Sequence, residues 1–188
     1  MLASTSPYRR TLLARLGLSF EVMAPDVDEA ALPGESARET ALRLAQAKAR
    51  AAALLFPRAL VIGSDQVAEL DGAYLGKPGN HENAVAQLKD MRGKTVLFHT
   101  ALALLNTASG TLHTAETATA VLFRNYDDHQ ISRYLERERP YDCTGSAKIE
   151  GLGIVLVERV TGDDPTALIG LPLIQLAALL RKEDVSIV

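Results

Sequence analysis

The chain opens with the stretch Leu2-Ala3-Ser4-Thr5-Ser6-Pro7-Tyr8-Arg9-Arg10, which passes from a short apolar start directly into a helical pattern. Pro7 suits the first position of a helix because its φ is already helical and it has no N–H group to leave unpaired. Ser6 precedes it and can accept hydrogen bonds from the first turn. Leucines then recur at helical spacing between residues 12 and 18. These features predict a helix that begins at Ser6 and packs one face while its N-terminus stays free.

The N-terminus of this predicted helix carries the groups that bind a polyanion. Unpaired N–H groups, two hydroxyls and two guanidinium groups meet there, and this combination favours a phosphate chain. The alternative is an ordinary capped surface helix whose arginines point into solvent. From this stretch alone, both interpretations are open.

Length and composition predict one soluble domain, residues 1–188. Of the 188 residues 47% are hydrophobic, which is enough for a sizeable core. The net charge of −3 argues against a protein that binds DNA or RNA, because such binding needs a broad positive surface. Cys143 is the single cysteine, and no apolar run has the length of a membrane span or the context of a signal peptide. We therefore expect a cytoplasmic protein that does not bind membranes.

Helical and strand patterns alternate along the chain. The capping-box spacing of Ser36 and Glu39 opens a helix that extends to about residue 56. The Asp71-Gly72 pair predicts a hairpin. Further helices are expected at 80–91, 127–138 and 171–181, and strands at 59–62, 66–70, 95–105, 112–123 and 154–160. This order predicts an α/β domain built around a mixed sheet.

A carboxylate stands where α/β proteins place reactive groups. Asp65 ends the run Gly63-Ser64-Asp65 after a short apolar strand, so the pattern places it at the C-terminal end of a buried strand. Ligand crevices gather at such strand ends, which makes Asp65 the leading candidate for a catalytic base. An aspartate that solvates the following hairpin is an equal alternative.

Other charged residues gain meaning from their joint occurrence. The cluster Asp26-Val27-Asp28-Glu29 offers hard oxygen ligands for Mg²⁺ or Mn²⁺ if a phosphate chain completes the shell. Short acidic runs are more often solvated loops. Lys48 and Lys77 add positive charges that, taken singly, are typical surface lysines.

Together these pieces resemble the Maf family of nucleotide pyrophosphatases over nearly the whole chain. The segments that carry the resemblance, in chain order, are Leu2-Ala3-Ser4-Thr5-Ser6-Pro7-Tyr8-Arg9-Arg10, Glu35-Ser36, Arg43-Leu44-Ala45-Gln46-Ala47-Lys48-Ala49, Gly63-Ser64-Asp65, Gly76-Lys77-Pro78, Glu150-Gly151-Leu152-Gly153 and Gly170-Leu171-Pro172-Leu173. Several motifs in one order are more specific than any single motif.

The resemblance implies a fold and an activity. The fold would be similar to that of the inosine triphosphate pyrophosphatases, with a mixed twisted sheet flanked by helices and two lobes around a central cleft. The reaction would cut a nucleoside triphosphate between its α- and β-phosphates, giving the monophosphate and pyrophosphate. It would require a divalent metal cation, and the protein would be a homodimer.

The resemblance and the chemistry of the residues assign the same roles. Asp65 would orient the attacking water and take its proton, and Glu29 would bind the metal with Asp65 as a possible partner. The triphosphate would be neutralised by a set of polar and cationic groups, namely Ser4, Ser6, Arg9, Lys48 and Lys77.

Three positions depart from the pattern most common in the family. That pattern has Arg in place of Tyr8, often Thr in place of Gln66, and Gln in place of Glu150. The departures resemble the Maf subgroup that hydrolyses 7-methyl-GTP instead of dTTP, UTP and CTP. N7-methylation gives guanine a positive charge, which the ring of Tyr8 would attract by about 0.5–2 kcal/mol. Glu150 could accept from the N1–H and 2-amino groups of guanine, and Gln66 could add an amide contact.

Alternatives remain for these residues and for the whole protein. Tyr8 could be a core aromatic of the first turn, and Glu150 a solvated loop carboxylate. The protein could instead clear dTTP, UTP, CTP or another modified nucleotide. It could also sense a nucleotide and regulate cell division without turnover.

Overall fold

The computed structural model describes residues 1–188, which form five helices of the α type and seven strands. The helices are α1 (Pro7–Ala14), α2 (Ala37–Ala53), α3 (His81–Met91), α4 (Asp128–Glu138) and α5 (Leu173–Lys182). The strands are β1 (Leu2–Ala3), β2 (Val22–Met23), β3 (Leu60–Leu70), β4 (Ala73–Leu75), β5 (Thr95–Asn106), β6 (Leu112–Phe123) and β7 (Val157–Gly162). The expected α/β class is confirmed.

The strands form one mixed sheet in the order β2-β1-β3-β5-β6-β7, with β4 paired to β3 beside that path. β1 pairs in parallel with β2 and β3, whereas β4 and β7 pair antiparallel with β3 and β6. Leu70 pairs with Ala73, which confirms the hairpin predicted at Asp71-Gly72.

The chain divides into two compact units. Unit 1 comprises Met1–Gln66, His99–Thr117 and Asp164–Val188, and unit 2 comprises Val67–Phe98 and Ala118–Asp163. The chain passes between the units within β3, β5 and β6, and once more between Asp163 and Asp164. Two units agree with the two lobes that the family resemblance implies.

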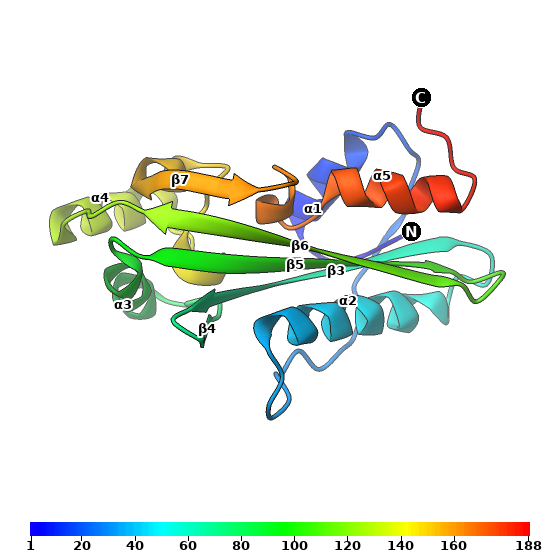
Figure 1. The fold of residues 1–188 in the computed structure, drawn as a ribbon, viewed down its shortest axis with the longest axis horizontal. Coiled ribbons are helices and arrows are strands. Elements are labelled where there is room, and N and C mark those ends of the chain that lie inside the picture. The colour runs from blue at the N-terminus through cyan, green and yellow to red at the C-terminus, as the bar shows by residue number, and fades with distance from the viewer. The chain divides into compact units, whose positions relative to one another are not determined.

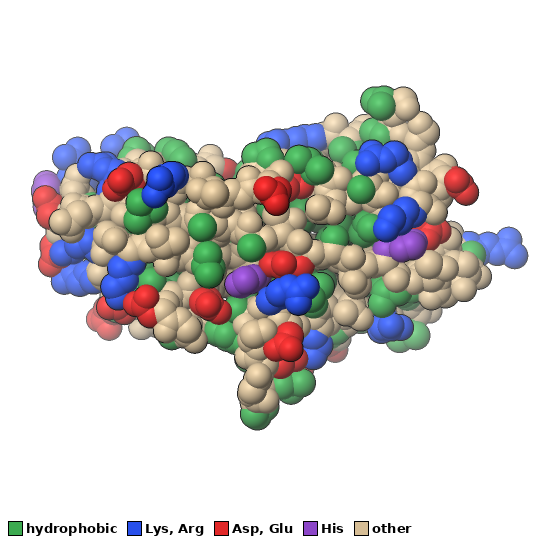
Figure 2. All heavy atoms as spheres, in the orientation of Figure 1, with side chains coloured by type: hydrophobic (Ala, Val, Ile, Leu, Met, Phe, Trp, Pro, Cys, Tyr) green, Lys and Arg blue, Asp and Glu red, His purple; other side chains and the backbone are tan.

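In unit 1, helices cover both faces of the sheet (Figure 1). α1 and α5 share one face, where Leu12, Leu13 and leucines 176, 179 and 180 pack with Ile62 in a common core. α2 covers the other face (Figure 1). On the face seen in Figure 2, acidic and basic side chains are interspersed, as expected for a net charge of −3.

The predicted helix starts are largely confirmed because capping is local. Ser6 caps α1 by accepting from the N–H group of Arg9, and Pro7 is the first helical residue. Ser36 and Glu39 form a reciprocal capping box at the start of α2. The last helix begins two residues later than predicted, since Pro172 is its N-cap and Asp164 accepts from the N–H group of Ile174.

The predicted position of Asp65 at the end of a strand is wrong. The runs 59–62 and 66–70 belong to one continuous strand, β3, and Asp65 lies in its middle. Parallel pairing with β1 stops at Gly63, and β3 continues beyond it. The polar residues Ser64, Asp65 and Gln66 do not end the strand, because their side chains are hydrogen-bonded to other parts of the protein. The predicted strand 154–160 likewise begins later, at Val157, after a short 3-10 helix.

Gly63 allows α2 to approach β3 closely. A Cβ atom at this position would lie 2.1 Å from the Ala45 carbonyl oxygen and 2.7 Å from the Ala49 backbone nitrogen. Both are backbone atoms of a helix, so they cannot rotate away. We expect Gly63→Ala to lower the free energy of unfolding by about 2–4 kcal/mol, measured by urea denaturation. A change within about 0.5 kcal/mol, the range of a harmless surface substitution, would contradict this account of the packing.

Candidate active site

Ser4, Ser6 and Arg9 form a hydrogen-bonded group at the start of α1. The Ser4 hydroxyl oxygen accepts from the Ser6 N–H group at 3.1 Å and from Arg9 Nη1 at 3.4 Å. The Ser6 hydroxyl oxygen accepts from the Arg9 N–H group at 3.3 Å. In these contacts the serine oxygens accept, so each hydroxyl keeps its proton for donation to a ligand. Tyr8 lies in the same turn and is half-buried.

Arg9 is anchored by a backbone carbonyl from the far end of the sequence. Its Nε atom donates to the Gly170 carbonyl at 2.8 Å. Gly170 has a φ of 115°, a backbone conformation that residues other than glycine rarely adopt. Burial lowers the pKa of the Arg9 guanidinium from its ordinary value, while the negative charges of Asp65 and Glu29 raise it. The guanidinium still stays charged at neutral pH, and it lies within the electrostatic field of both carboxylates.

Lys48 joins two of the predicted acidic residues. Its Nζ atom lies 2.6 Å from Asp65 Oδ1 and 2.5 Å from Glu29 Oε1. Lys48 and Asp65 are buried, with side chains 7% and 10% exposed, whereas the Glu29 side chain is 57% exposed. The exposed carboxylate marks the side from which solvent reaches this triad.

Consecutive residues of β3 serve opposite faces of the sheet. Asp65 points to α2 and Lys48, whereas Ser64 and Gln66 point to the segment 164–173. The Gly170 carbonyl accepts both from Ser64 Oγ, at 2.9 Å, and from Arg9 Nε. One carbonyl group therefore links Arg9 to the residue that precedes Asp65.

The side chain of Gln66 is committed to the protein through its nitrogen. Nε2 contacts Thr100 Oγ1 at 2.9 Å and the carbonyls of Ala167 and Leu168 at 3.1 and 3.0 Å. An amide contact to a base would therefore use the carbonyl oxygen, Oε1, as an acceptor. The sequence pattern did not distinguish these two ends of the amide.

Two predicted site residues, Lys77 and Glu150, belong to unit 2. Both are exposed, on loops of that unit. Although Glu150 is exposed as a whole residue, partial desolvation of its carboxyl raises its pKa, and a hydrogen bond from its own backbone and the nearby charge of Lys148 oppose this shift. In unit 1 the structure thus forms two groups, one in which Lys48 contacts Glu29 and Asp65 and one in which Ser4, Ser6 and Arg9 are hydrogen-bonded, while Gln66 points to the opposite face of the sheet from Asp65.

Comparison with known proteins agrees with the motifs and the fold. The model of the family described as Maf-like protein matches residues 1–183. The chain belongs to the Maf family. A 7-methyl-GTP pyrophosphatase from Polaromonas sp. is 58% identical over 187 residues, covering all of this chain and 85% of the relative. Proteins of the same name from Thiobacillus denitrificans and Methylobacillus flagellatus are 58% and 54% identical, and the matches cover 93% and 98% of those proteins.

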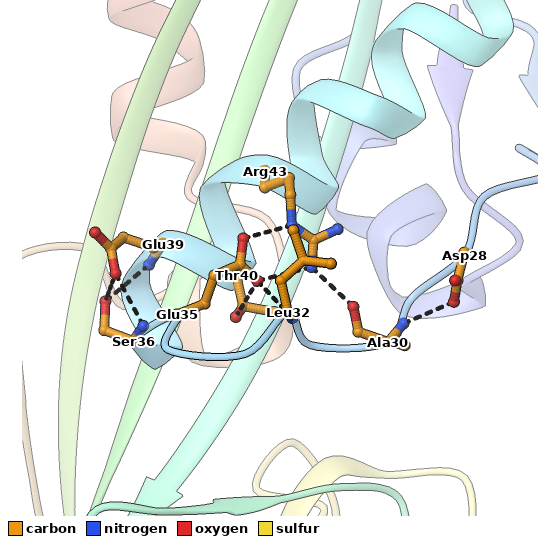
Figure 3. A network of polar contacts seen from close by, with 8 residues as sticks. All are labelled: Asp28, Ala30, Leu32, Glu35, Ser36, Glu39, Thr40 and Arg43. Carbon is orange, nitrogen blue, oxygen red and sulfur yellow. Dashed lines mark hydrogen bonds and ion pairs between the residues drawn. The ribbon is translucent and has the colours of Figure 1, made fainter.

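In this Maf protein a clamp between Glu35 and Arg43 holds the loop that carries Glu29 (Figure 3). Arg43 Nε and Nη2 donate to the two carboxylate oxygens of Glu35 at 2.6 and 2.8 Å. Nη2 also donates to the carbonyl of Ala30, the residue after Glu29, at 2.8 Å. Glu35 further accepts from Thr40 Oγ1. The clamp fixes the loop to α2, the helix that carries Lys48. Glu35 and Arg43 both lie in segments that carry the family resemblance, but the sequence did not predict that they contact each other.

We expect the clamp to control the ionisation of Glu35. Hydrogen bonds from Arg43 lower the Glu35 pKa from 4.5 to about 2. Because the Glu35 pKa is lower in the folded state than in the unfolded chain, the ionised carboxylate stabilises the fold above pH 4.5. That contribution disappears as the pH falls through about 2. In Arg43→Met the Glu35 pKa should rise towards 4.5, measured by NMR titration of its carboxyl carbon. Arg50→Met, an exposed position on the same helix, is the control. An unchanged Glu35 pKa in Arg43→Met would show that the bidentate contact has no such effect.

The Glu29–Asp65 pair has the chemistry of a divalent metal site completed by substrate. Carboxylate oxygens are the ligands that Mg²⁺ prefers, and Mg²⁺ in nucleotide enzymes is commonly held by one or two carboxylates plus phosphate oxygens. Both carboxylates already converge on one cation, the Lys48 ammonium. The chain has no group of three or more His, Cys, Asp or Glu residues that could hold a metal ion, so substrate oxygens would have to complete the shell around these two carboxylates. The two carboxylates therefore fit the predicted cation.

Proposed function

We propose that this Maf protein hydrolyses 7-methyl-GTP between the α- and β-phosphates, releasing 7-methyl-GMP and pyrophosphate. The observation that carries the proposal is the contact of one buried ammonium, that of Lys48, with both Asp65 and Glu29, whose negative charges also act on Arg9 at the start of α1. Three relatives at 54–58% identity bear the name of that activity. The site has cationic groups for the triphosphate and a buried carboxylate for the attacking water.

The residues of unit 1 supply the steps of an in-line displacement at phosphorus. Asp65 orients the water and accepts its proton. Ser4, Ser6 and Arg9 donate hydrogen bonds to the phosphate chain, and Lys48 holds the carboxylates in place. When bound by Glu29 and Asp65, Mg²⁺ or Mn²⁺ would lower the pKa of water and offset phosphate charge. Lys77, assigned through its motif in unit 2, would neutralise the departing pyrophosphate.

Selection of the methylated base is proposed for Tyr8, Gln66 and Glu150. The ring of Tyr8 attracts a cation, and the carboxylate of Glu150 accepts from two N–H groups of guanine, which a pyrimidine cannot supply. Gln66 offers its carbonyl oxygen, because its nitrogen is engaged by the protein.

The wider setting is also part of the proposal. The enzyme acts as a homodimer in the cytoplasm, on a small nucleotide and not on nucleic acid or a membrane. None of the helices is both long enough and apolar enough to cross a bilayer.

Glu150→Gln tests the assignment of the base. Removing the charge but keeping the shape of the side chain should lower the ratio of kcat/KM for 7-methyl-GTP over UTP about tenfold, because the charge-assisted pair with the N1–H and 2-amino groups of guanine becomes neutral and uracil has no such pair to lose. The wild-type preference should also fall as acid protonates Glu150, and its raised pKa places this loss at a higher pH than for an ordinary glutamate. Glu150→Gln should show no such pH dependence. An unchanged ratio in the variant would remove Glu150 from base recognition.

A nucleotide panel with pyrophosphate detection separates the other candidates. Activity highest on dTTP, UTP or CTP would favour the pyrimidine-preferring subgroup. Binding without pyrophosphate release, with Mg²⁺ and Mn²⁺ each tested, would favour a nucleotide sensor that regulates cell division.

A further inference from the structure

The side chain of Gln87 on α3 connects two loops of unit 2. Its Nε2 atom donates to the Gly76 carbonyl at 3.0 Å, and its Oε1 atom accepts from the Ser146 hydroxyl at 2.5 Å. Gly76 immediately precedes Lys77, and Ser146 lies four residues before Glu150. One amide group therefore uses its donor on the loop of Lys77 and its acceptor on the loop of Glu150.

The backbone on each side of Lys77 is held in place. The Gly76 carbonyl also accepts from the Gly145 N–H group at 3.2 Å. After Lys77, the Pro78 carbonyl accepts from Asn83 Nδ2 at 2.9 Å, and Pro78 itself is buried. The Lys77 side chain is exposed, but its backbone has a fixed course set by α3 and by residue 145.

Ser146 adopts a conformation that costs free energy. It is fully buried and has a φ of 57°, in the left-handed region that residues other than glycine seldom occupy. Such conformations persist where the surroundings fix them, and they gather at functional sites. Here the Tyr134 hydroxyl donates to the Ser146 carbonyl at 3.1 Å and accepts from the Lys148 N–H group at 3.0 Å. Gln87 and Tyr134 thus hold Ser146 from α3 and α4.

We propose that Gln87 is a positioning residue that couples the phosphate-binding loop of Lys77 to the base-reading loop of Glu150. The inference rests on the proposed function, because the roles of both loops come from it. Gln87 touches neither substrate nor reacting atoms in this assignment. Its effect is to fix the two loops relative to each other, so that its loss disturbs triphosphate binding and base discrimination together.

Gln87→Met is the test variant, because methionine has a similar length and neither donates nor accepts an amide hydrogen bond. Tyr126→Phe is the matched control. The Tyr126 hydroxyl is buried and donates to the carbonyl of Leu88, the next residue of the same helix, at 2.8 Å. Both variants remove side-chain hydrogen bonds at α3, but only Gln87→Met breaks the bridge between the loops.

We expect Gln87→Met to lower kcat/KM for 7-methyl-GTP about tenfold and the ratio of kcat/KM for 7-methyl-GTP over UTP about fivefold, as expected when binding groups are displaced from their productive positions. Tyr126→Phe should change both by less than about twofold at a comparable loss of thermal stability. Hydrogen exchange should show faster exchange at both residues 76–79 and 145–150 in Gln87→Met only. Changes below about twofold in Gln87→Met, or equal changes in both variants, would overturn the coupling.

Ser146→Ala provides a second route if Gln87→Met does not fold. Ser146→Ala removes only the hydroxyl that donates to Gln87 Oε1. Because both substitutions break this same hydrogen bond, the losses in kcat/KM should not add in the double variant. Additive effects would contradict the bridge. A failure of the proposed function looks different, because the wild-type protein would release no pyrophosphate from 7-methyl-GTP. The exchange comparison would then still decide whether Gln87 couples the two loops.

Discussion

Asp65→Asn is expected to lower kcat by about 10³-fold while leaving nucleotide binding measurable. The amide keeps the size of the side chain and an oxygen for Lys48 Nζ, now 2.6 Å from Asp65 Oδ1, but it cannot accept the proton of water. Pyrophosphate release gives kcat, and calorimetry with 7-methyl-GTP gives the affinity. Lys48 keeps its contact with Glu29, so the fold around the triad should survive.

The control for Asp65→Asn is Asp71→Asn. Asp71 is exposed and lies in the turn between β3 and β4. Its kcat should stay within about twofold of wild type, as expected for a surface change. Turnover by Asp65→Asn within tenfold of wild type would assign proton transfer to another group. Loss of both turnover and binding would instead mean that Asp65 holds the nucleotide, directly or through the metal.

Arg9→Lys should lower kcat/KM about 100-fold. Arg9 uses Nε to bond the Gly170 carbonyl at 2.8 Å, which orients the guanidinium and leaves a terminal nitrogen to bind phosphate. Lysine has the same charge but a single nitrogen, so it cannot place one donor at the Gly170 carbonyl and another where the terminal guanidinium nitrogens of Arg9 lie. Steady-state kinetics with 7-methyl-GTP measure the loss.

Arg10→Lys is a matched control for Arg9→Lys, because Arg10 is the next residue and is exposed. We expect its kcat/KM to change by less than about twofold. Equal losses in the two variants would show that positive charge near the start of α1 matters, and that the anchored geometry of Arg9 does not.

Local features of the fold were predictable because neighbouring residues determine them. Ser6 and the Ser36–Glu39 pair cap their helices through contacts three residues apart. The position of Asp65 was not predictable in this way. The run Gly63-Ser64-Asp65 has the composition of a strand end, and only partners distant in sequence show why it continues: the helix beside Gly63, the carbonyls beside Ser64 and the lysine beside Asp65.

The candidate site was predictable as a set of residues but not as a set of contacts. Motifs selected Glu29, Lys48 and Asp65, yet nothing in their spacing shows that one ammonium group bridges both carboxylates. Gln87 was missed for a related reason. It lies in an amphipathic helix with an ordinary polar side chain, and its role arises only when two loops, eleven and fifty-nine residues away, meet it.

The alternation along β3 limits how this protein can change by insertion or deletion. Ser64 and Gln66 serve one layer, and Gly63 and Asp65 serve the other. A single added residue upstream would exchange these assignments, turning the carboxylate away from its lysine and pushing a side chain into the helix backbone. Length variation should therefore be tolerated in the turn after β3 but not within the strand. A library of single-codon insertions, selected for pyrophosphate release, would reveal this boundary.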